Sequence, residues 1–180
     1  DDKKFRDTLT RGMNDLATKT GMGECLSGLV DSLVGWMGQD PSDEVVSMCA
    51  VASNHAKNAQ NMGSEPKMLG YIIEELKPEK CSSDEKFYRL IKTATNIAKY
   101  DEVIVQNKKN YRSAFMFVKL GLQRTVLESL KELLSMKSSF NDAQNKQVST
   151  LVGCLESISL CKEGLRDLLS KKTGYLKVLV

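Results

Sequence analysis

The sequence contains few residues that break helices or form covalent cross-links. Three prolines, Pro41, Pro66 and Pro78, are spread over 180 residues, so long uninterrupted helices are permitted. The five cysteines are odd in number and show no C-x-x-C spacing, which excludes complete disulfide pairing and argues against a zinc site. Most of them lie in helical patterns, so we expect buried free thiols in a reducing compartment.

Several function classes lack their usual signals. No apolar run approaches about 18 residues and no signal-peptide pattern is present, so we expect no membrane insertion. The net charge is only +3 and aromatic residues make up 6%, too little to indicate direct nucleic-acid binding. With one histidine and no G-x-S-x-G, P-loop or H-E-x-x-H motif, the sequence predicts no enzyme, no metal site and no cofactor.

Apolar residues at spacings of three and four are the pattern that is present, and strict alternation is not, so the sequence predicts an all-α fold. Hydrophobic residues at 41% suffice for one domain with a sizeable core. The chain begins without methionine, and we expect a fragment of a longer protein. The predicted helices span about 2–19, 24–37, 41–61, 67–76, 83–101, 103–112, 115–135, 142–160, 162–170 and 173–180.

Two start signals support these helix boundaries. Asp40 is predicted as an N-cap with Pro41 at the first helical position. Ser82-x-x-Glu85 reads as a capping box that opens the helix at 83–101.

The helices recur with a regular period. Asp15, His55 and Asn96 lie near the centres of three long helices and are separated by 40 and 41 residues. A helical period near 40 is typical of armadillo or HEAT solenoids, with a fourth unit centred near Ser157. A single helical bundle with accidental spacing is the alternative.

The helix at 83–101 has an unusual polar face. Its apolar residues recur on one side, whereas Arg89, Lys92, Asn96 and Lys99 share another, with Tyr100 beside them and no acid between Phe87 and Asp101. Taken alone, this face is an ordinary solvated surface. On the concave wall of a solenoid it would instead favour an acidic partner. His55, as a lone histidine, is by default a surface or packing residue.

Four stretches, taken in order, resemble the β-catenin armadillo family. They are "MNDLATKTGMGECLSGLVDSLVGWMGQDPSDEVVSMCAVASN" from Met13, "RLIKTATNIAKYDE" from Arg89, "FVKLGLQRTVLESL" from Phe117 and "LVGCLESISLCKEGLRDLLSKKTGYLKVLV" from Leu151. The resemblance covers nearly the whole chain and implies about four repeats from the second half of an armadillo domain. It implies a right-handed superhelix whose groove is lined by helices at about 2–19, 41–61, 83–101 and 142–160.

The resemblance also implies a function. Members of this family hold extended acidic peptides in a basic groove, so the chain would be a Wnt-pathway transcriptional coactivator of cytoplasm and nucleus that binds the acidic N-terminal segment of a TCF/LEF transcription factor. Alternatives are a cell-adhesion adaptor that binds a cadherin tail, or a nuclear-import receptor. Such receptors place tryptophan four residues before each groove asparagine, where this chain has Ala50 and Lys92.

Carried over by position, the resemblance assigns peptide-binding roles to eight residues. Asparagine and histidine would hydrogen-bond the peptide backbone, and the cations would pair with its acids. Lys57 and Ala59 align equally well with the family's groove lysine. The assigned residues are Asn54, His55, Lys57, Arg89, Lys92, Asn96, Lys99 and Tyr100.

Overall fold

The computed structural model describes residues 4, 8, 11, 12, 15, 28–81, 83–105, 108–135 and 140–170. These residues form helices and one antiparallel hairpin, so the predicted all-α class holds except at the hairpin. Residues of the predicted helices at 2–19 and 173–180 lie mostly or wholly outside the described part. The elements are α2 (Val30–Gln39), α3 (Asp43–Ala52), α4 (Ala56–Ser64), α5 (Pro66–Glu75), α6 (Asp84–Tyr100), β1 (Glu102–Val105), β2 (Lys108–Tyr111), α7 (Arg112–Lys119), α8 (Leu122–Ser135), α9 (Asp142–Ile158) and α10 (Lys162–Leu169).

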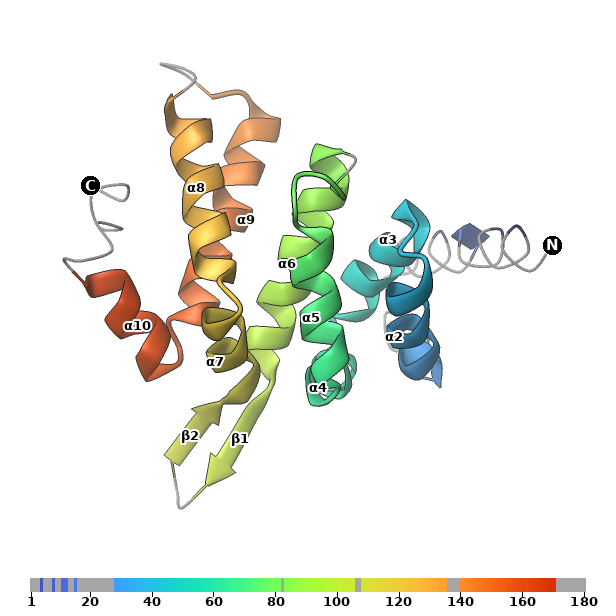
Figure 1. Cartoon of the computed structure of the whole chain (residues 1–180), viewed down its shortest axis with the longest axis horizontal. Coiled ribbons are helices and arrows are strands. Elements are labelled where there is room, and N and C mark those ends of the chain that lie inside the picture. Colours follow the sequence, from blue (N-terminus) through green and yellow to red (C-terminus); the bar gives the residue numbers. More distant parts are fainter. Residues whose placement is uncertain are drawn as a thin grey trace.

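The helices follow one another along the long axis of the molecule, from α2 at one end to α10 at the other (Figure 1). The central helix α6 packs against α3, α4 and α5 before it and against α7 and α9 after it. In the view of Figure 1, α5 lies over α6 and α8 lies over α9, and both pairs are in contact. Among the described helices, none is long and apolar enough to cross a bilayer.

One continuous apolar core joins helices α2 to α10. Each helix contributes the residues of its buried stripe, and the partly exposed Trp36 packs on the edge of this core. Burial of this surface is the main stabilising contribution to the fold. The largest fully buried side chains include Leu33, Met48, Ile72, Ile97 and Phe117.

The predicted continuous helix at 41–61 is wrong, because the chain breaks into α3 and α4 at Ser53, Asn54 and His55. Ser53 bonds back to the carbonyl of Ala50 through its hydroxyl (3.1 Å), which satisfies a helix-end acceptor. The side chain of Asn58 donates to the carbonyl of Ala52 at 3.2 Å, which serves the end of α3 in the same way. Side-chain hydrogen bonds of this kind stabilise a turn at a position where the spacing of apolar residues predicts that the helix continues.

The predicted helix at 103–112 is also wrong, since this segment forms the β1–β2 hairpin, which projects from the body of the molecule (Figure 1). In its register Glu102 faces Tyr111, and the tyrosine hydroxyl donates to the glutamate at 3.2 Å. The run Glu102–Val105 contains three consecutive β-branched residues, which prefer an extended backbone over a helix.

The predicted helix at 115–135 is interrupted at Leu120 and Gly121, so that α7 and α8 are separate. Gly121 has a φ of 86°, in the left-handed region that other residues rarely adopt. Glycine at this position ends α7 in the manner of a helix C-cap and redirects the chain into α8.

Both predicted start signals are displaced by one or two residues. Ser42, not Asp40, caps α3 by accepting the backbone N–H of Val45, and the backbone of Asp40 instead closes the end of α2. Ser83 caps α6 by accepting the N–H of Lys86 at 3.1 Å. Because the third helical residue there is a lysine, no capping box forms on Ser83, and Ser82 lies outside the described residues.

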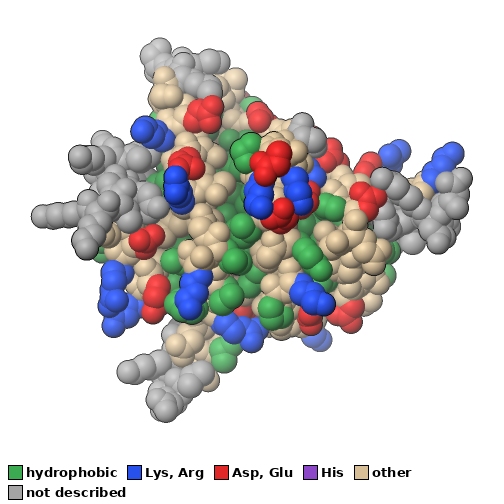
Figure 2. Space-filling view, viewed as in Figure 1, with side chains coloured by type: hydrophobic (Ala, Val, Ile, Leu, Met, Phe, Trp, Pro, Cys, Tyr) green, Lys and Arg blue, Asp and Glu red, His purple; other side chains and the backbone are tan. Residues whose placement is uncertain are grey.

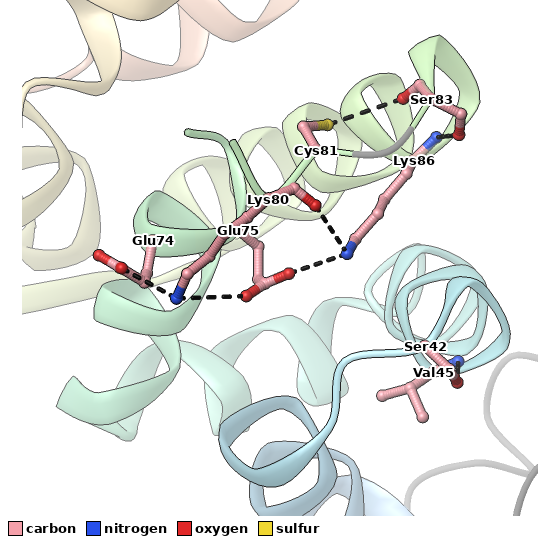
Figure 3. Close-up of polar contacts among 8 residues, drawn as sticks. All are labelled: Ser42, Val45, Glu74, Glu75, Lys80, Cys81, Ser83 and Lys86. Atoms are coloured by element: carbon pink, nitrogen blue, oxygen red, sulfur yellow. Dashed lines mark hydrogen bonds and ion pairs between the residues drawn. The ribbon is translucent and has the colours of Figure 1, made fainter. Parts of the chain in front are cut away.

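A buried ion pair joins α5 to α6. Nζ of Lys86 lies 2.8 Å from a carboxylate oxygen of Glu75, and the two side chains are 7% and 11% exposed. The same ammonium group donates to the carbonyl of Lys80, and Lys80 in turn pairs with Glu74 at 2.9 Å (Figure 3). The link positions α6 because a buried charge is stable only while its partner stays in place.

A second buried polar group fixes the other end of α6. The carboxylate of Asp101 accepts the hydroxyl of Ser113 at 2.5 Å and its backbone N–H at 3.2 Å, which satisfies a donor in the first turn of α7. Gly63 of α4 approaches the same point, where an added Cβ would lie 2.8 Å from the Ser113 hydroxyl. The start of α7, the end of α6 and α4 therefore meet at one close contact.

Candidate peptide-binding surface

The candidate surface is the solvent-facing side of α6 together with the adjoining parts of the α3–α4 turn and α9. The opposite side of α6 is buried against its neighbours through Leu90, Ile91 and Ile97. Lys92 and Lys99 are exposed on the outer side, and Asn96 lies half-buried between them. The spacing of the apolar residues therefore predicts correctly which side of α6 is buried.

Asn96 connects α6 to the α3–α4 turn. Its side-chain amide donates to the hydroxyl of Ser53 at 3.1 Å and to the side-chain oxygen of Asn54 at 3.2 Å. Within the described residues, the oxygen of Asn96 and the amide hydrogens of Asn54 make no further hydrogen bonds. The pair thus offers one acceptor and one donor at the surface, the two groups that an extended peptide backbone requires.

The cation Arg89 is neutralised by an acid that the sequence interpretation passed over. Its guanidinium pairs with Glu85 at 2.5 Å, one helical turn earlier, and also reaches the carbonyl of Asp43 at 3.5 Å. The face therefore carries less net positive charge than the segment from Phe87 to Asp101 indicates by itself. The i, i+4 spacing of Glu85 and Arg89 was visible in the sequence and is the signal that predicts this pair.

Lys92 faces a second cation across the α6–α9 contact. Partial burial lowers the pKa of Lys92, and the charge of Lys146 on α9 lowers it further. Sequence reasoning missed Lys146, although it placed α9 among the groove-lining helices. Like charges held near each other are unfavourable alone, and an anion placed between them relieves the repulsion.

The remaining cations differ in their surroundings. The ammonium group of Lys99 lies 5.4 Å from the centre of the Tyr100 ring, within the range of a cation–π contact. Lys57 on α4 is exposed, whereas Ala59 is fully buried. Of the two residues that align with the groove lysine, only Lys57 presents its side chain to solvent.

His55 occupies the N-cap position of α4 with an extended backbone. Its side chain is half-buried, and among the described residues no group bonds its buried Nδ1. His55 follows Asn54 in the chain, so the turn places it next to the amide pair.

Cys49 and Cys154 are buried free thiols. Burial raises the pKa of Cys49 and of Cys154 to about 12, so both thiols stay protonated near neutral pH. The described residues include no group of three histidine, cysteine, aspartate or glutamate side chains placed to hold a metal ion. What this surface offers is hydrogen bonding and positive charge.

Comparison with models of known protein families, with curated proteins and with solved structures finds no match to this chain.

Proposed function

We propose that the protein is an armadillo-type helical scaffold of the β-catenin kind, which binds an extended acidic peptide along α3–α4, α6 and α9. In a Wnt-type pathway its ligand is the acidic N-terminal segment of a TCF/LEF transcription factor. The observation that carries the proposal is the hydrogen-bonded amide pair of Asn54 and Asn96, with the exposed Lys92 one helical turn before Asn96 on α6.

The packing order supports the scaffold. Helix α6 contacts α3 on one side and α9 on the other, while α5 and α8 contact α6 and α9 respectively. This succession is what a solenoid of stacked helical repeats requires, because each repeat contacts its neighbours. The polar sides of α3–α4, α6 and α9 then belong to one surface, along which a peptide can run.

The chemistry of the surface supports an acidic, extended ligand. The free acceptor of Asn96 and the free donors of Asn54 match a peptide backbone without demanding a particular side chain. Positive charge is supplied by exposed lysines on α4, α6 and α9, namely Lys57, Lys92, Lys99 and Lys146. Each exposed ion pair contributes at most about 1 kcal/mol, so affinity must come from several contacts along the peptide.

The test is titration of an acidic TCF/LEF-type peptide against the wild type and the double variant Lys92→Glu, Lys99→Glu. We expect the double variant to bind at least about tenfold more weakly, since two attractive contacts become repulsive. The affinity of the wild type should also fall as salt is raised, because these charges are exposed.

The matched control reverses two exposed lysines on other helices, Lys67→Glu on α5 and Lys131→Glu on α8. It changes the net charge by the same amount and should leave the affinity within about twofold. Equal weakening by both double variants would mean that the loss of affinity comes from the overall charge of the protein and not from this surface. Equal affinity of the wild type and the Lys92, Lys99 variant would disprove the proposed surface. A cadherin-tail peptide titrated in parallel separates an adhesion ligand from a transcriptional one.

A further inference from the structure

A second surface feature lies apart from the polar side of α6. A cleft of about 780 Å³ runs between the end of α5, the α5–α6 connection and the start of α6 on one side and α8 on the other, with Gln147 of α9 in its lining. The face in Figure 2 shows hydrophobic side chains at the surface among charged groups of both signs. None of the eight residues assigned to the peptide surface lines this cleft.

The floor of the cleft is apolar and aromatic. Ile73, Phe87, Tyr88 and Leu133 are only partly buried by the core, so each leaves apolar surface to solvent. The Phe87 and Tyr88 rings meet edge to face with their centres 5.3 Å apart, which holds both in place. Exposed apolar surface rimmed by polar groups is typical of a binding site.

The rim of the cleft is acidic. Asp84 of α6 and Glu132 of α8 stand on opposite sides, and both lie near enough to Tyr88 that, after burial, they raise the pKa of its hydroxyl. Within the described residues neither carboxylate has a hydrogen-bond or ion-pair partner. The other charged lining residues, Lys77 and Glu128, are already paired with Glu74 and Arg124.

We propose that this cleft docks a basic amphipathic helix of another protein. The apolar side of that helix lies on Ile73, Phe87 and Leu133, and an arginine or lysine reaches the Tyr88 ring between Asp84 and Glu132. The unpaired carboxylates supply the charge complementarity, and the aromatic ring adds a cation–π contact.

The walls favour a helix over an extended strand. The α6 and α8 walls are the sides of helices, whose backbone N–H and C=O groups are bonded within each helix. In the α5–α6 connection, the backbone N–H groups of Leu76, Lys77 and Cys81 are also bonded to nearby carbonyls. An extended peptide would bury backbone groups against these walls without partners, whereas a helix satisfies its own. The lining on α8 runs from Thr125 to Leu133, a length of about 12 Å at 1.5 Å per residue, which accommodates roughly two turns of a partner helix.

The probe is a synthetic helical peptide of roughly 14 residues, with leucines along one side and arginines beside them, about 21 Å long. Its comparator carries glutamate in place of every arginine. We expect saturable binding of the basic peptide to the full chain and binding at least about tenfold weaker for the comparator.

Two variants of the protein locate the site. Asp84→Asn with Glu132→Gln should weaken the basic peptide about tenfold, the scale expected for two partly exposed ion pairs. Ser129→Trp, which fills the cleft from α8, should abolish binding. The matched control Glu156→Gln with Glu163→Gln removes two exposed carboxylates elsewhere and should change the affinity less than about twofold, with circular dichroism confirming the fold of each variant.

The rate of alkylation of Cys81 provides an independent measure of peptide binding. Cys81 lines the cleft and is partly exposed, whereas Cys49, Cys154 and Cys161 are buried. Bound peptide should slow alkylation of Cys81 at pH 8.5, as followed by mass spectrometry. The proposal is overturned by absent binding, by equal affinity of the two peptides, or by binding that survives Ser129→Trp. Because Lys92→Glu with Lys99→Glu should leave the basic peptide bound, either proposal can fail alone.

Discussion

At the scale of single residues, Asn96 has a structural task as well as a proposed binding task. Both of its amide hydrogens are used within the protein, on Ser53 and Asn54, which leaves its oxygen for the proposed ligand. The α3–α4 turn is therefore held in place before any ligand arrives. A substitution at Asn96 affects stability and binding together, and the two effects must be measured separately.

Asn96→Ala should lower the free energy of unfolding by about 1–2 kcal/mol, because two hydrogen bonds between α6 and the turn are lost. Urea denaturation followed by circular dichroism measures the change. Asn145→Ala, at an exposed position of α9, is the matched control and should stay within about 0.5 kcal/mol of the wild type. Equal stability of the Asn96 variant and the control would show that this link contributes nothing.

The pairing of like charges predicts a change in titration. Burial and Lys146 both lower the pKa of Lys92, so its charged form is disfavoured in the folded state. Between this lowered pKa and the usual value the unfolded chain binds more protons, and stability rises with pH in that interval below 10.5. Lys146→Ala should raise the pKa of Lys92 without restoring it fully, since burial remains. NMR titration of the lysine side chain detects the shift, and an unchanged pKa would place Lys146 too far away to matter.

At the scale of elements, replacing glycine by alanine should change the stability in opposite directions at two positions. Gly121→Ala should destabilise the protein by about 1 kcal/mol, because its φ of 86° strains any residue with a Cβ. Gly70→Ala, within α5, meets no atom within 4 Å and should stabilise by about 0.5–1 kcal/mol, as alanine does in a helix. Thermal unfolding of the two variants gives both signs, and a stabilised Gly121 variant would contradict the assigned break between α7 and α8.

The α5–α6 ion pair predicts a non-additive double substitution. Lys86→Met should cost roughly 2–4 kcal/mol, because Glu75 then keeps a buried charge whose remaining partner among the described residues is the more distant Lys80. Adding Glu75→Leu removes that charge and should recover a large part of the loss. A double-mutant cycle in urea measures the coupling, and purely additive losses would mean that the two groups do not interact.

The sequence predicted the helices wherever apolar residues recur at helical spacing over a long run. It did not predict where a helix is interrupted. The predicted ranges 83–101, 142–160 and 162–170 agree with α6, α9 and α10 to within one or two residues. The hairpin was missed because Val103 and Ile104 also fit a helical period in so short a run. The α3–α4 break depends on side-chain bonds from Ser53 and Asn58, and periodicity contains no information about them.

For the candidate surface, the sequence predicted which residues share a face of α6. It did not predict which residues of other helices they contact. The position of Lys92 and Asn96 on the outer side of α6 followed from the spacing of apolar residues. The contact of Asn96 with the α3–α4 turn and the approach of Lys146 to Lys92 depend on how helices pack across α6. Single-helix patterns do not encode such contacts, because they arise between segments more than 40 residues apart.

At the scale of the whole molecule, stability should be graded along the long axis. Helix α6 packs against neighbours on both sides, whereas the strongest contact of α10 is with α7. Amide hydrogen exchange should therefore be roughly 100-fold or more slower in α6 than in α10, because α10 can open locally.

Two core truncations distinguish local from global opening. Ile97→Ala in α6 should accelerate exchange throughout the described helices, since it weakens contacts on both sides of the core. Leu168→Ala in α10 should accelerate exchange mainly in α10 itself. Mass spectrometry of exchanged peptides reads both variants, and a uniform response to Leu168→Ala would indicate one cooperative unit instead.

The arrangement of helices in sequence order along one axis has a mechanical consequence. A stretching force applied along this axis passes through α2, α3, α6 and α9 one after another, so helix layers bear the load in series. Layers loaded in series separate one at a time, at the weakest junction first. The molecule should thus lengthen in steps under tension, with α10 detaching early and α6 keeping its packing until late. A protein built in this way would extend gradually under a stretching force.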